Sequence, residues 1–451
     1  MDQRHQLLLE TARRLIRRDA SPSLANLLLK THPADVAHLF RDLELREQHT
    51  LFTLIDDPEL AATVLSELDP AVSALLLGDL KKEAITEVLE EMAYDDAVDV
   101  IQNLPEELAA EILQAMEDVD SQEIEQLLQY DEDSAGGIMS TEIFSLSEEM
   151  TVRQAIDAIH QAEHVEMVFY LYVTDAHNHL VGVLSLRKLL TVSPEKTLSE
   201  IMVREVISVR TDVDQEEVAR VVEKYSILAI PVINDTNKLM GVITVDDIID
   251  VIRREATEDI YKMAGANDEE LLLGYDSLRI ARLRLPWLLT NLLGGVVTGY
   301  LMWRFKVTLR DVIALITFIP VITGMGGNVG GQSATIVVRG FATGRIDVGS
   351  IRRVIFREMR VGVVMGMVCG LAVGLIAWAW HGNPYLGLVV GFAMIMAITV
   401  AATMGVLAPA FFKRIGVDPA IAAAPFVQTA NDITGILIYF ATATSFIKLL
   451  H

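Results

Sequence analysis

The sequence predicts a multidomain membrane protein with an all-α helical-repeat domain, an α/β domain pair and a five-helix α transmembrane domain. Three observations support this fold class. Short helical units repeat along the first part of the chain, two similar copies of strands and helices follow, and long apolar segments fill the last part. The charge divides in the same way, because residues 1–275 carry a net charge of −34 and residues 276–451 carry +9. The acidic balance argues against nucleic acid as a partner.

The first region, placed at residues 1–132, is predicted to be a series of short helices. Units such as PADVAHLFRDL, PELAATVLSEL and PAVSALLLGDL begin with proline, and KEAITEVLEEM and YDDAVDVIQNL begin near an acid. Proline and acids are typical of the first helical turn, and apolar residues recur in these units at spacings of three and four. We therefore expect stacked helices that bury one another's apolar faces.

The pattern changes to alternating strands and helices in residues 133–255, in two similar copies. In each copy a helix, starting at Val152 or Gln215, precedes two apolar strands joined by a polar turn, and another helix closes the copy. This arrangement resembles a tandem of CBS domains, βαββα modules that pair and often bind adenine nucleotides.

A nucleotide site is implied by this resemblance. The second copy ends a strand with GVITVDDI, in which Thr244 and Asp247 are similar to the ribose-contacting pattern of CBS domains. The first copy has GVLSLRKL instead, with Lys188 at the place of the acid, although Arg187 and Lys188 are suited to meet phosphates. The resemblance implies ATP or another adenine nucleotide as a ligand, whereas each residue taken singly is also compatible with a purely structural role.

Acidic residues gather where the chain leads towards the membrane. Residues 246–265 form an amphipathic helical pattern, and residues 256–277 are assigned to a connecting helix. Similar acids occur in the helical region and before the last span, and carboxylates on separate surfaces repel unless a cation lies between them. Oxygen ligands of this kind suit Mg²⁺, which keeps part of its water shell. The candidate regulatory ligands are Asp95, Asp96, Asp99, Glu216, Asp247, Asp250, Glu255, Glu258, Asp259 and Asp418. The alternative for any single helix is an ordinary solvated face.

Five segments of the last part, residues 278–451, are long and apolar enough to span a bilayer. They are Leu285 to Trp303, Val312 to Val338, Val361 to Trp380, Tyr385 to Phe412 and Ala420 to Ile447. Glycine or proline interrupts the second, fourth and fifth, which suggests tilts, kinks or unwound turns lining a cavity. The single cysteine, Cys369, lies within the third span, so disulfide bonds within a subunit are excluded.

Basic residues beside the spans predict the orientation. The N-terminus is charged and amphipathic without the apolar core of a signal peptide, so it is expected in the cytoplasm. Eleven basic residues then flank the cytoplasmic ends of the spans and four flank the outer ends. We expect a multi-pass protein of the cell (inner) membrane with cytoplasmic N-terminal domains and, after an odd number of crossings, an outer C-terminus.

Asp432 is a carboxylate deep within the fifth apolar segment. A charged group at that depth costs at least ~2.5–3.5 kcal/mol, so it is expected to face a bundle interior or a water-filled path. Helical spacing places Ala424, Gln428, Asp432 and Gly435 on one face that can line such a path. The sequence therefore predicts ion movement. A protonated Asp432 that serves helix packing is the alternative.

Two further motifs complete the pattern, PVITGMGGNVGGQSATIVVRG in the second span and VDPAIAAAPFVQTANDITG around the fifth. Together with the helical repeats, the CBS tandem and the acidic connector, they resemble the MgtE family of magnesium transporters and channels across essentially the whole chain. The resemblance implies a homodimer in the lipid bilayer with five transmembrane helices per subunit and a pore on the two-fold axis. It further implies a pore ion at Asp432 and regulatory Mg²⁺ at the connector acids and Asp418.

The expected function is Mg²⁺ import, gated by cytoplasmic Mg²⁺ that binds between the helical domain, the CBS domains and the connecting helix. Polar groups of Asn328, Gln332, Ser333 and Thr335 are expected to hold the waters of a hydrated ion. Gly294, Gly295 and Gly366 are expected to serve close helix packing instead. The alternatives are a proton-coupled transporter of Co²⁺, Ni²⁺ or Mn²⁺ and a membrane-tethered nucleotide sensor. An enzyme is not expected, because no second acid or nucleophile–base pair is foreseen opposite Asp432 in the spans.

Overall fold

The structure is a computed structural model that describes residues 3–78, 80–161, 170–266, 277–421 and 425–447. The chain forms two compact units, Met1–Ile252 and Arg253–His451, which are described separately. The first unit begins with consecutive short helices. They are α1 (Gln3–Ile16), α2 (Ser21–Leu29), α3 (Pro33–Arg41), α4 (Leu45–Phe52), α5 (Pro58–Ser66), α6 (Pro70–Leu77), α7 (Lys82–Glu90), α8 (Tyr94–Gln102), α9 (Glu106–Leu113) and α10 (Asp118–Leu127).

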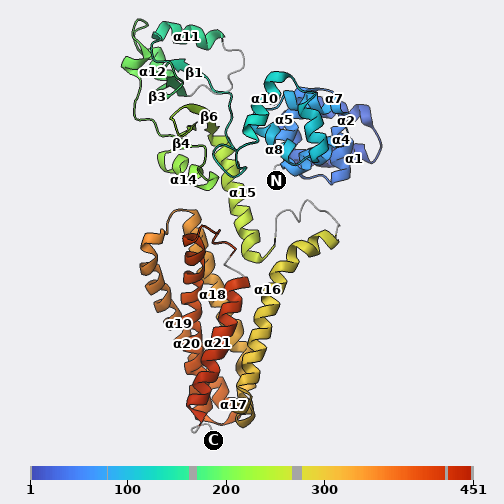
Figure 1. Cartoon of the computed structure of the whole chain (residues 1–451). Coiled ribbons are helices and arrows are strands. Elements are labelled where there is room, and N and C mark those ends of the chain that lie inside the picture. The colour runs from blue at the N-terminus through green and yellow to red at the C-terminus, as the bar shows by residue number, and fades with distance from the viewer. Residues whose placement is uncertain (1–2, 79, 162–169, 267–276, 422–424, 448–451) are drawn as a thin grey trace. The chain divides into compact units, whose positions relative to one another are not determined.

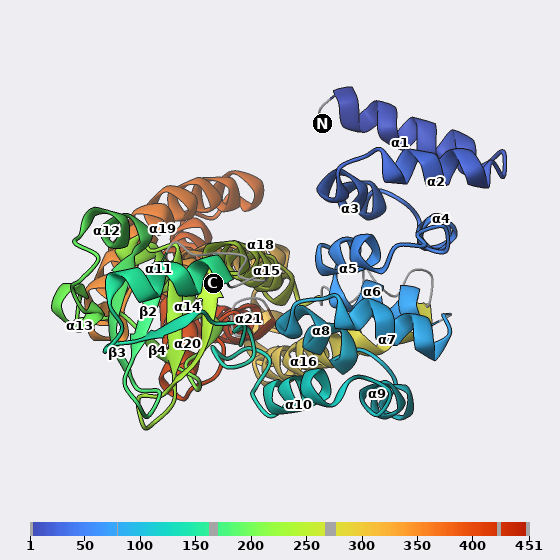
Figure 2. The ribbon, with the colours of Figure 1, turned by 90° about the horizontal axis from the view of Figure 1, so that it is seen from above.

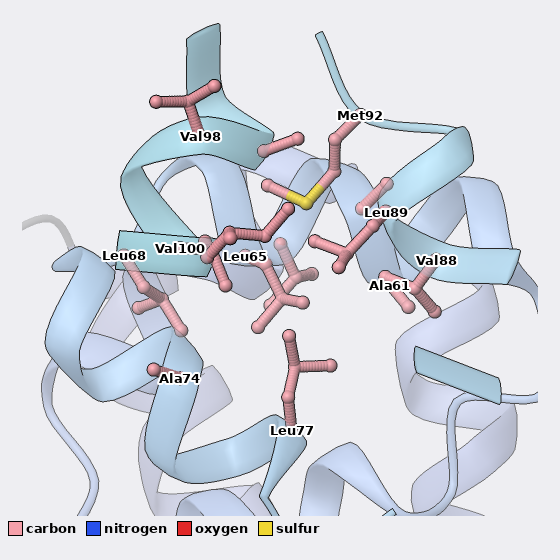
Figure 3. Packing of buried hydrophobic residues seen from close by; sticks show 14 of the residues in the cluster. Ala61, Leu65, Leu68, Ala74, Leu77, Val88, Leu89, Met92, Val98 and Val100 are labelled. Carbon is pink, nitrogen blue, oxygen red and sulfur yellow. The ribbon is translucent and has the colours of Figure 1, made fainter. Parts of the chain in front are cut away.

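These helices stack because each is too short to bury its apolar face alone. The odd-numbered helices α1 to α9 contact one another in series, and α4, α6, α8 and α10 do the same, which gives the curved stack seen in Figure 2. Proline occupies the first turn of α3, α5 and α6, as the repeat pattern predicted. Figure 3 shows Leu65, Leu77, Leu89 and Val100 of successive helices pointing into one shared core. The predicted helical repeat is confirmed.

Two three-stranded sheets follow, one for each predicted copy. The first consists of β1 (Ser145–Ser147), β2 (Tyr170–Thr174) and β3 (Leu180–Ser185), and the second of β4 (Val209–Arg210), β5 (Ala229–Ile233) and β6 (Leu239–Thr244). In each sheet the first strand is parallel to the second and the second is antiparallel to the third. The accompanying helices are α11 (Val152–Gln161), α12 (Leu186–Thr191), α13 (Leu198–Ile201) and α14 (Gln215–Tyr225). The predicted helix starts at Val152 and Gln215 are confirmed.

The second copy shares its hydrophobic core with the helical stack. Val209, Val218 and Ile243 belong to the same buried cluster as the core of α3 to α10. Hydrogen bonds also link the second copy to Asp133, which follows α10. Gln215 N donates to Asp133 O at 2.8 Å, and the side-chain amide of Gln215 donates to Asp133 Oδ1 at 2.9 Å. Side chains of the helical stack can therefore reach those of the second copy.

The long helix α15 (Val245–Ala264) confirms the amphipathic helix predicted over residues 246–265. The boundary between the two compact units falls inside it, after Ile252. The remainder of the predicted connecting helix, residues 267–276, lies outside the described residues.

The second unit is built from long apolar helices that run side by side (Figure 1). They are α16 (Ser277–Arg304), α17 (Lys306–Asp311), the 3₁₀ helix η2 (Ile313–Phe318), α18 (Ile319–Ala342), the 3₁₀ turn η3 (Val348–Ser350), α19 (Ile351–His381), α20 (Pro384–Arg414) and α21 (Pro425–Ser445). Among the described residues, four stretches are long and apolar enough to cross a membrane: Ser277–Arg304, Ile313–Ala342, Val348–His381 and Pro384–Arg414. The fifth predicted span contains α21, which is not among these four, so the count of five spans stays a prediction.

Of the tilts, kinks or unwound turns expected in the second span, the structure shows an irregular stretch only near its start, and not at its glycines. α18 continues as an α-helix through its glycines from Ile319 to Ala342, and the irregularity lies before it, in the 3₁₀ turn η2. α20 likewise continues through Pro409 to Arg414. The glycines do not break α18 because close neighbours hold its backbone, as the next section describes.

Candidate functional site: a carboxylate on an apolar helix and two acidic clusters on α15

Asp432 lies near the middle of α21, where it is half-buried. No residue in the described part of the chain forms an ion pair with it. Gln428, one turn earlier, is exposed and packs with its aliphatic part against Gly327 of α18, where an added Cβ would lie 3.5 Å from Gln428 Cγ. Ala424, predicted to lie on the same face, falls outside the described residues.

The polar groups predicted on α18 divide between two faces of the helix. Asn328, Gln332 and Thr335 are exposed, as a path-lining role requires. Ser333 was predicted to share that role, but it is only 3% exposed, and its hydroxyl donates to Glu358 Oε2 at 3.0 Å. The prediction for Ser333 is wrong, because one residue along a helix turns the side chain by about 100° towards the neighbouring helix.

Glu358 is a buried acid that the sequence analysis missed. It lies on α19 and is 5% exposed, with Arg357 Nη2 3.1 Å from its Oε1. The third span was predicted to begin at Val361, which left Glu358 outside the spans, whereas α19 begins at Ile351. The bond to Ser333 ties α19 to the glycine-rich α18.

Glycines bring α18, α20 and α21 into close contact around this region. An added Cβ at Gly330 would lie 1.8 Å from Asn431 Nδ2, and one at Gly405 of α20 would lie 2.4 Å from Gly330 O. Asn431 is buried and donates to Gly326 O at 3.3 Å. Any side chain at these glycines would push apart the helices beside Asp432.

The structure supports the predicted packing role for two of the three glycines. Gly294 lies against Thr429 of α21, because an added Cβ would be 2.1 Å from Thr429 Cγ2, and Gly366 lies against Ile395 of α20. Both predictions are confirmed. The prediction for Gly295 is wrong, since no described atom lies within 4 Å of an added Cβ there.

The first acidic cluster joins α8 to the start of α15. Burial raises the pKa of Asp95 well above its ordinary value, and the nearby charges of Asp96, Asp247 and Asp99 raise it further. The Oδ1 atom of Asp95 is buried and has no hydrogen-bond partner in the described part of the chain. Burial also raises the pKa of Asp247. The structure therefore brings together the acids of the helical region and of α15 that the sequence analysis paired.

The second acidic cluster lies near the end of α15 and contains a cation that was not predicted. Lys262 Nζ lies 2.7 Å from Asp418 Oδ2 and 2.5 Å from Glu258 Oε1. Partial burial alone would lower the pKa of Lys262, but its bonds to Asp418 and Glu258 raise it instead. Glu258 and Asp418 are thus compensated by an ammonium group. The sequence feature that could have revealed this ion pair is a lysine four residues after Glu258.

The other predicted ligands lie along these elements. Glu255 and Asp259 are half-buried on α15, whereas Asp250 is exposed there. Glu216, in the first turn of α14, forms an ion pair with Arg220 at 3.3 Å.

The predicted nucleotide residues have a local structural function in the described chain. Asp247 Oδ2 accepts hydrogen bonds from Thr244 N at 3.1 Å and Thr244 Oγ1 at 2.5 Å, which caps the first turn of α15. At α12 the N-cap residue itself provides the cap, because Ser185 Oγ accepts from Lys188 N, and Arg187 and Lys188 are exposed. A cavity of about 330 Å³ between α10 and the paired sheets is lined by Tyr130 and other residues, but not by Thr244 or Asp247.

Comparisons with known proteins match most of the chain. Residues 319–442 match the family model described as divalent cation transporter (MgtE), residues 31–133 match the MgtE intracellular N domain, and residues 135–195 and 198–254 match the CBS domain. The chain is 40% identical over 326 residues to the magnesium transporter MgtE of Thermus thermophilus, which covers 71% of this chain and 72% of that protein. The chain belongs to the MgtE family. It is also 41% identical over 327 residues to the Enterococcus faecalis magnesium transporter MgtE, covering 72% of each.

A solved structure of an MgtE relative resembles the first unit. The cytosolic domain of the Mg²⁺ channel MgtE in complex with ATP aligns with 54% of this chain and 99% of that chain, at 34% sequence identity and a TM-score of 0.50. The family is one of transporters and channels. Its named members confirm the helical domain, the CBS tandem and the apolar C-terminal helices as an MgtE architecture.

Proposed function

We propose that this MgtE-family protein conducts Mg²⁺ across the cell membrane along a path that passes Asp432. The observation that carries the proposal is a half-buried carboxylate inside an apolar helix, without an ion-pair partner among the described residues. It lies within the segment that matches the divalent cation transporter model, and two relatives are named magnesium transporters. A carboxylate that pairs with no protein cation attracts a mobile one.

The ion is proposed to pass in a largely hydrated form. Mg²⁺ gives up its water reluctantly, so one carboxylate and several amide or hydroxyl groups suit it better than a dry cage. Gln428 on α21 and the exposed Asn328, Gln332 and Thr335 on α18 offer such groups. We propose that two copies pair about a two-fold axis in the bilayer, so that two Asp432 carboxylates flank one path.

Cytoplasmic Mg²⁺ is proposed to regulate this path through α15. Asp95 and Asp247 form an electrostatically strained pair at its start, and Glu258 and Asp418 lie at its end. A divalent ion bound by either pair favours the conformation that holds the carboxylates together. High cytoplasmic Mg²⁺ would then close the path, which requires only a few kcal/mol of differential binding. We propose accordingly that the first unit lies in the cytoplasm and that, after five crossings, the C-terminus lies outside.

An adenine nucleotide is a second proposed ligand. The relative whose cytosolic domain aligns with the first unit is described in complex with ATP. Thr244 and Asp247 would meet the ribose and Arg187 the phosphates, at the cost of the cap that Asp247 now makes.

The test is Mg²⁺ uptake into liposomes by the purified protein and two variants. Asp432→Asn keeps the side-chain shape but removes the charge, so we expect uptake to fall by at least tenfold. Asp347→Asn removes one exposed acid elsewhere in the second unit and keeps a helix-capping side chain, so its uptake should match the parent. Normal uptake by folded Asp432→Asn would reject the proposed path. Uptake that requires a proton gradient would instead favour a proton-coupled divalent cation transporter, and the absence of flux in the parent would favour a nucleotide sensor.

A further inference from the structure

The turn between β2 and β3 carries three side chains that can bind a metal. Asp175, His177 and His179 each offer one ligand atom, and these atoms lie within 4.8 Å of one another. The two imidazole rings are 5.9 Å apart between centroids and tilted by 31°. The side chains of Asp175 and His179 are 26% and 34% exposed, so an ion can reach them from solvent.

The backbone of the turn is held in place by Asp175. Its Oδ1 accepts from His177 N at 2.8 Å and from His179 N at 2.9 Å, and its Oδ2 lies 2.9 Å from His179 Nδ1. Asn178 between the histidines adopts a φ of 65°, a left-handed conformation that asparagine tolerates.

The equivalent turn of the second sheet forms without any of these metal ligands. Asn234 takes the place of Asp175, and its Oδ1 accepts from Thr236 N and Lys238 N, both at 3.0 Å. Asn237 repeats the left-handed conformation with a φ of 63°. The fold of this turn therefore needs neither an acid at the position of Asp175 nor an imidazole. The two histidines of the first copy are additional to what the turn requires.

Each turn also anchors the other. Asn178 Nδ2 donates to Leu239 O at 3.2 Å, and Asn237 Nδ2 donates to Leu180 O at 3.0 Å. Backbone bonds from Leu180 N to Asn237 O and from Leu239 N to Asn178 O, both 3.0 Å, complete the contact. The ligand-bearing turn is consequently rigid, and little conformational entropy is lost when an ion orders its side chains.

We propose that Asp175, His177 and His179 bind a late first-row divalent metal ion, for which Zn²⁺ is the probe. Imidazole nitrogen is a ligand for Zn²⁺, Ni²⁺ and Cu²⁺, whereas Mg²⁺ takes oxygen ligands. Two imidazoles and one carboxylate match the ligand number of zinc sites that leave the fourth position to water. This site differs in chemistry from the acidic clusters of α15, whose candidate ligands are all carboxylates. It lies in the turn before β3, at the opposite end of that strand from Arg187, which is proposed for nucleotide.

The test transplants the turn of the second copy into the first. In the full-length protein, Asp175→Asn, His177→Thr and His179→Lys together place at the three ligand positions the residues that form the second turn, Asn234, Thr236 and Lys238, so the variant should keep its fold. Zinc binding is measured by equilibrium dialysis with Mg²⁺ in large excess, which occupies the all-oxygen sites. We expect the parent to bind one equivalent of Zn²⁺ per chain. The transplanted variant should not bind this equivalent. Bound Cu²⁺ should show nitrogen hyperfine coupling in its electron paramagnetic resonance spectrum, and the variant should lose that signal.

The matched control removes two imidazoles elsewhere. His5 and His38 face each other at 6.3 Å between ring centroids, and His5 also pairs with Asp42 at 2.6 Å. The double variant His5→Gln and His38→Gln should still bind one equivalent of Zn²⁺ per chain. Equal zinc binding by parent and transplanted variant, or an equal loss in the control, would overturn the proposal. Mg²⁺ uptake measured in the same preparations reports separately on the proposed transport function.

Discussion

Replacing Lys262 by Gln should strengthen Mg²⁺ binding at the end of α15. The ammonium lies between Glu258 and Asp418, and an ion that bridges these carboxylates must first displace it. The side chains of Lys262, Glu258 and Asp418 are 29%, 38% and 32% exposed. Each such partly exposed ion pair contributes about 0.5–1 kcal/mol, so removal of the competitor should gain about 1–2 kcal/mol. This corresponds to a roughly 5- to 30-fold lower Mg²⁺ concentration at half-saturation.

The assay is hydrogen–deuterium exchange of the amides of α15 during a Mg²⁺ titration. Glutamine keeps most of the length of the lysine side chain. The hydrogen–deuterium exchange measurement also does not depend on a protease cleavage site at residue 262. Lys262→Arg is the control, because it retains the cation and should follow the parent curve. A Lys262→Gln curve that coincides with the parent, or moves to higher Mg²⁺, would mean that no ion binds between Glu258 and Asp418.

Two further outcomes follow from the packing and the electrostatics. Gly330→Ala should destabilise the second unit by about 1–3 kcal/mol because its Cβ would overlap Asn431, which a thermal denaturation in detergent can measure. Gly331→Ala is the control, since no described atom lies within 4 Å of its Cβ, and equal losses would contradict the packing argument. Asp95→Asn should stabilise the protein at neutral pH without divalent ions. The folded-state pKa of Asp95 is raised, so the parent loses stability as pH rises from about 4 towards that pKa, and the variant should lose less. If the stability of the parent and of Asp95→Asn changed with pH in the same way, the destabilising effect assigned to the Asp95 charge would be contradicted.

The fold was predictable where local sequence determines it. Helix starts such as Pro33, Pro58 and Pro70 follow from the fixed backbone angle of proline and its missing amide hydrogen. The two sheets follow from apolar runs separated by turns rich in Asn and Asp, which tolerate the positive φ observed at Asn178 and Asn237.

What the sequence could not supply is the partner of each polar group in space. Lys262 and Asp418 are 156 residues apart, and no spacing rule reveals their contact. Gly294 and Gly295 are adjacent and chemically identical, yet only Gly294 faces Thr429. Ser333 differs from its neighbour Gln332 in the same way, because the helix turns one towards Glu358 and leaves the other exposed.

The two acidic clusters of α15 differ in what they offer an ion. At the start of the helix, Asp95 and Asp247 have raised pKa values, and neither pairs with a cation in the described chain. At the end, Lys262 already neutralises part of the charge of Glu258 and Asp418. A divalent ion therefore relieves repulsion at the first cluster but must compete with an ammonium at the second. If both regulate the path, the first should fill at lower Mg²⁺, and Lys262 sets the higher concentration at which the second follows.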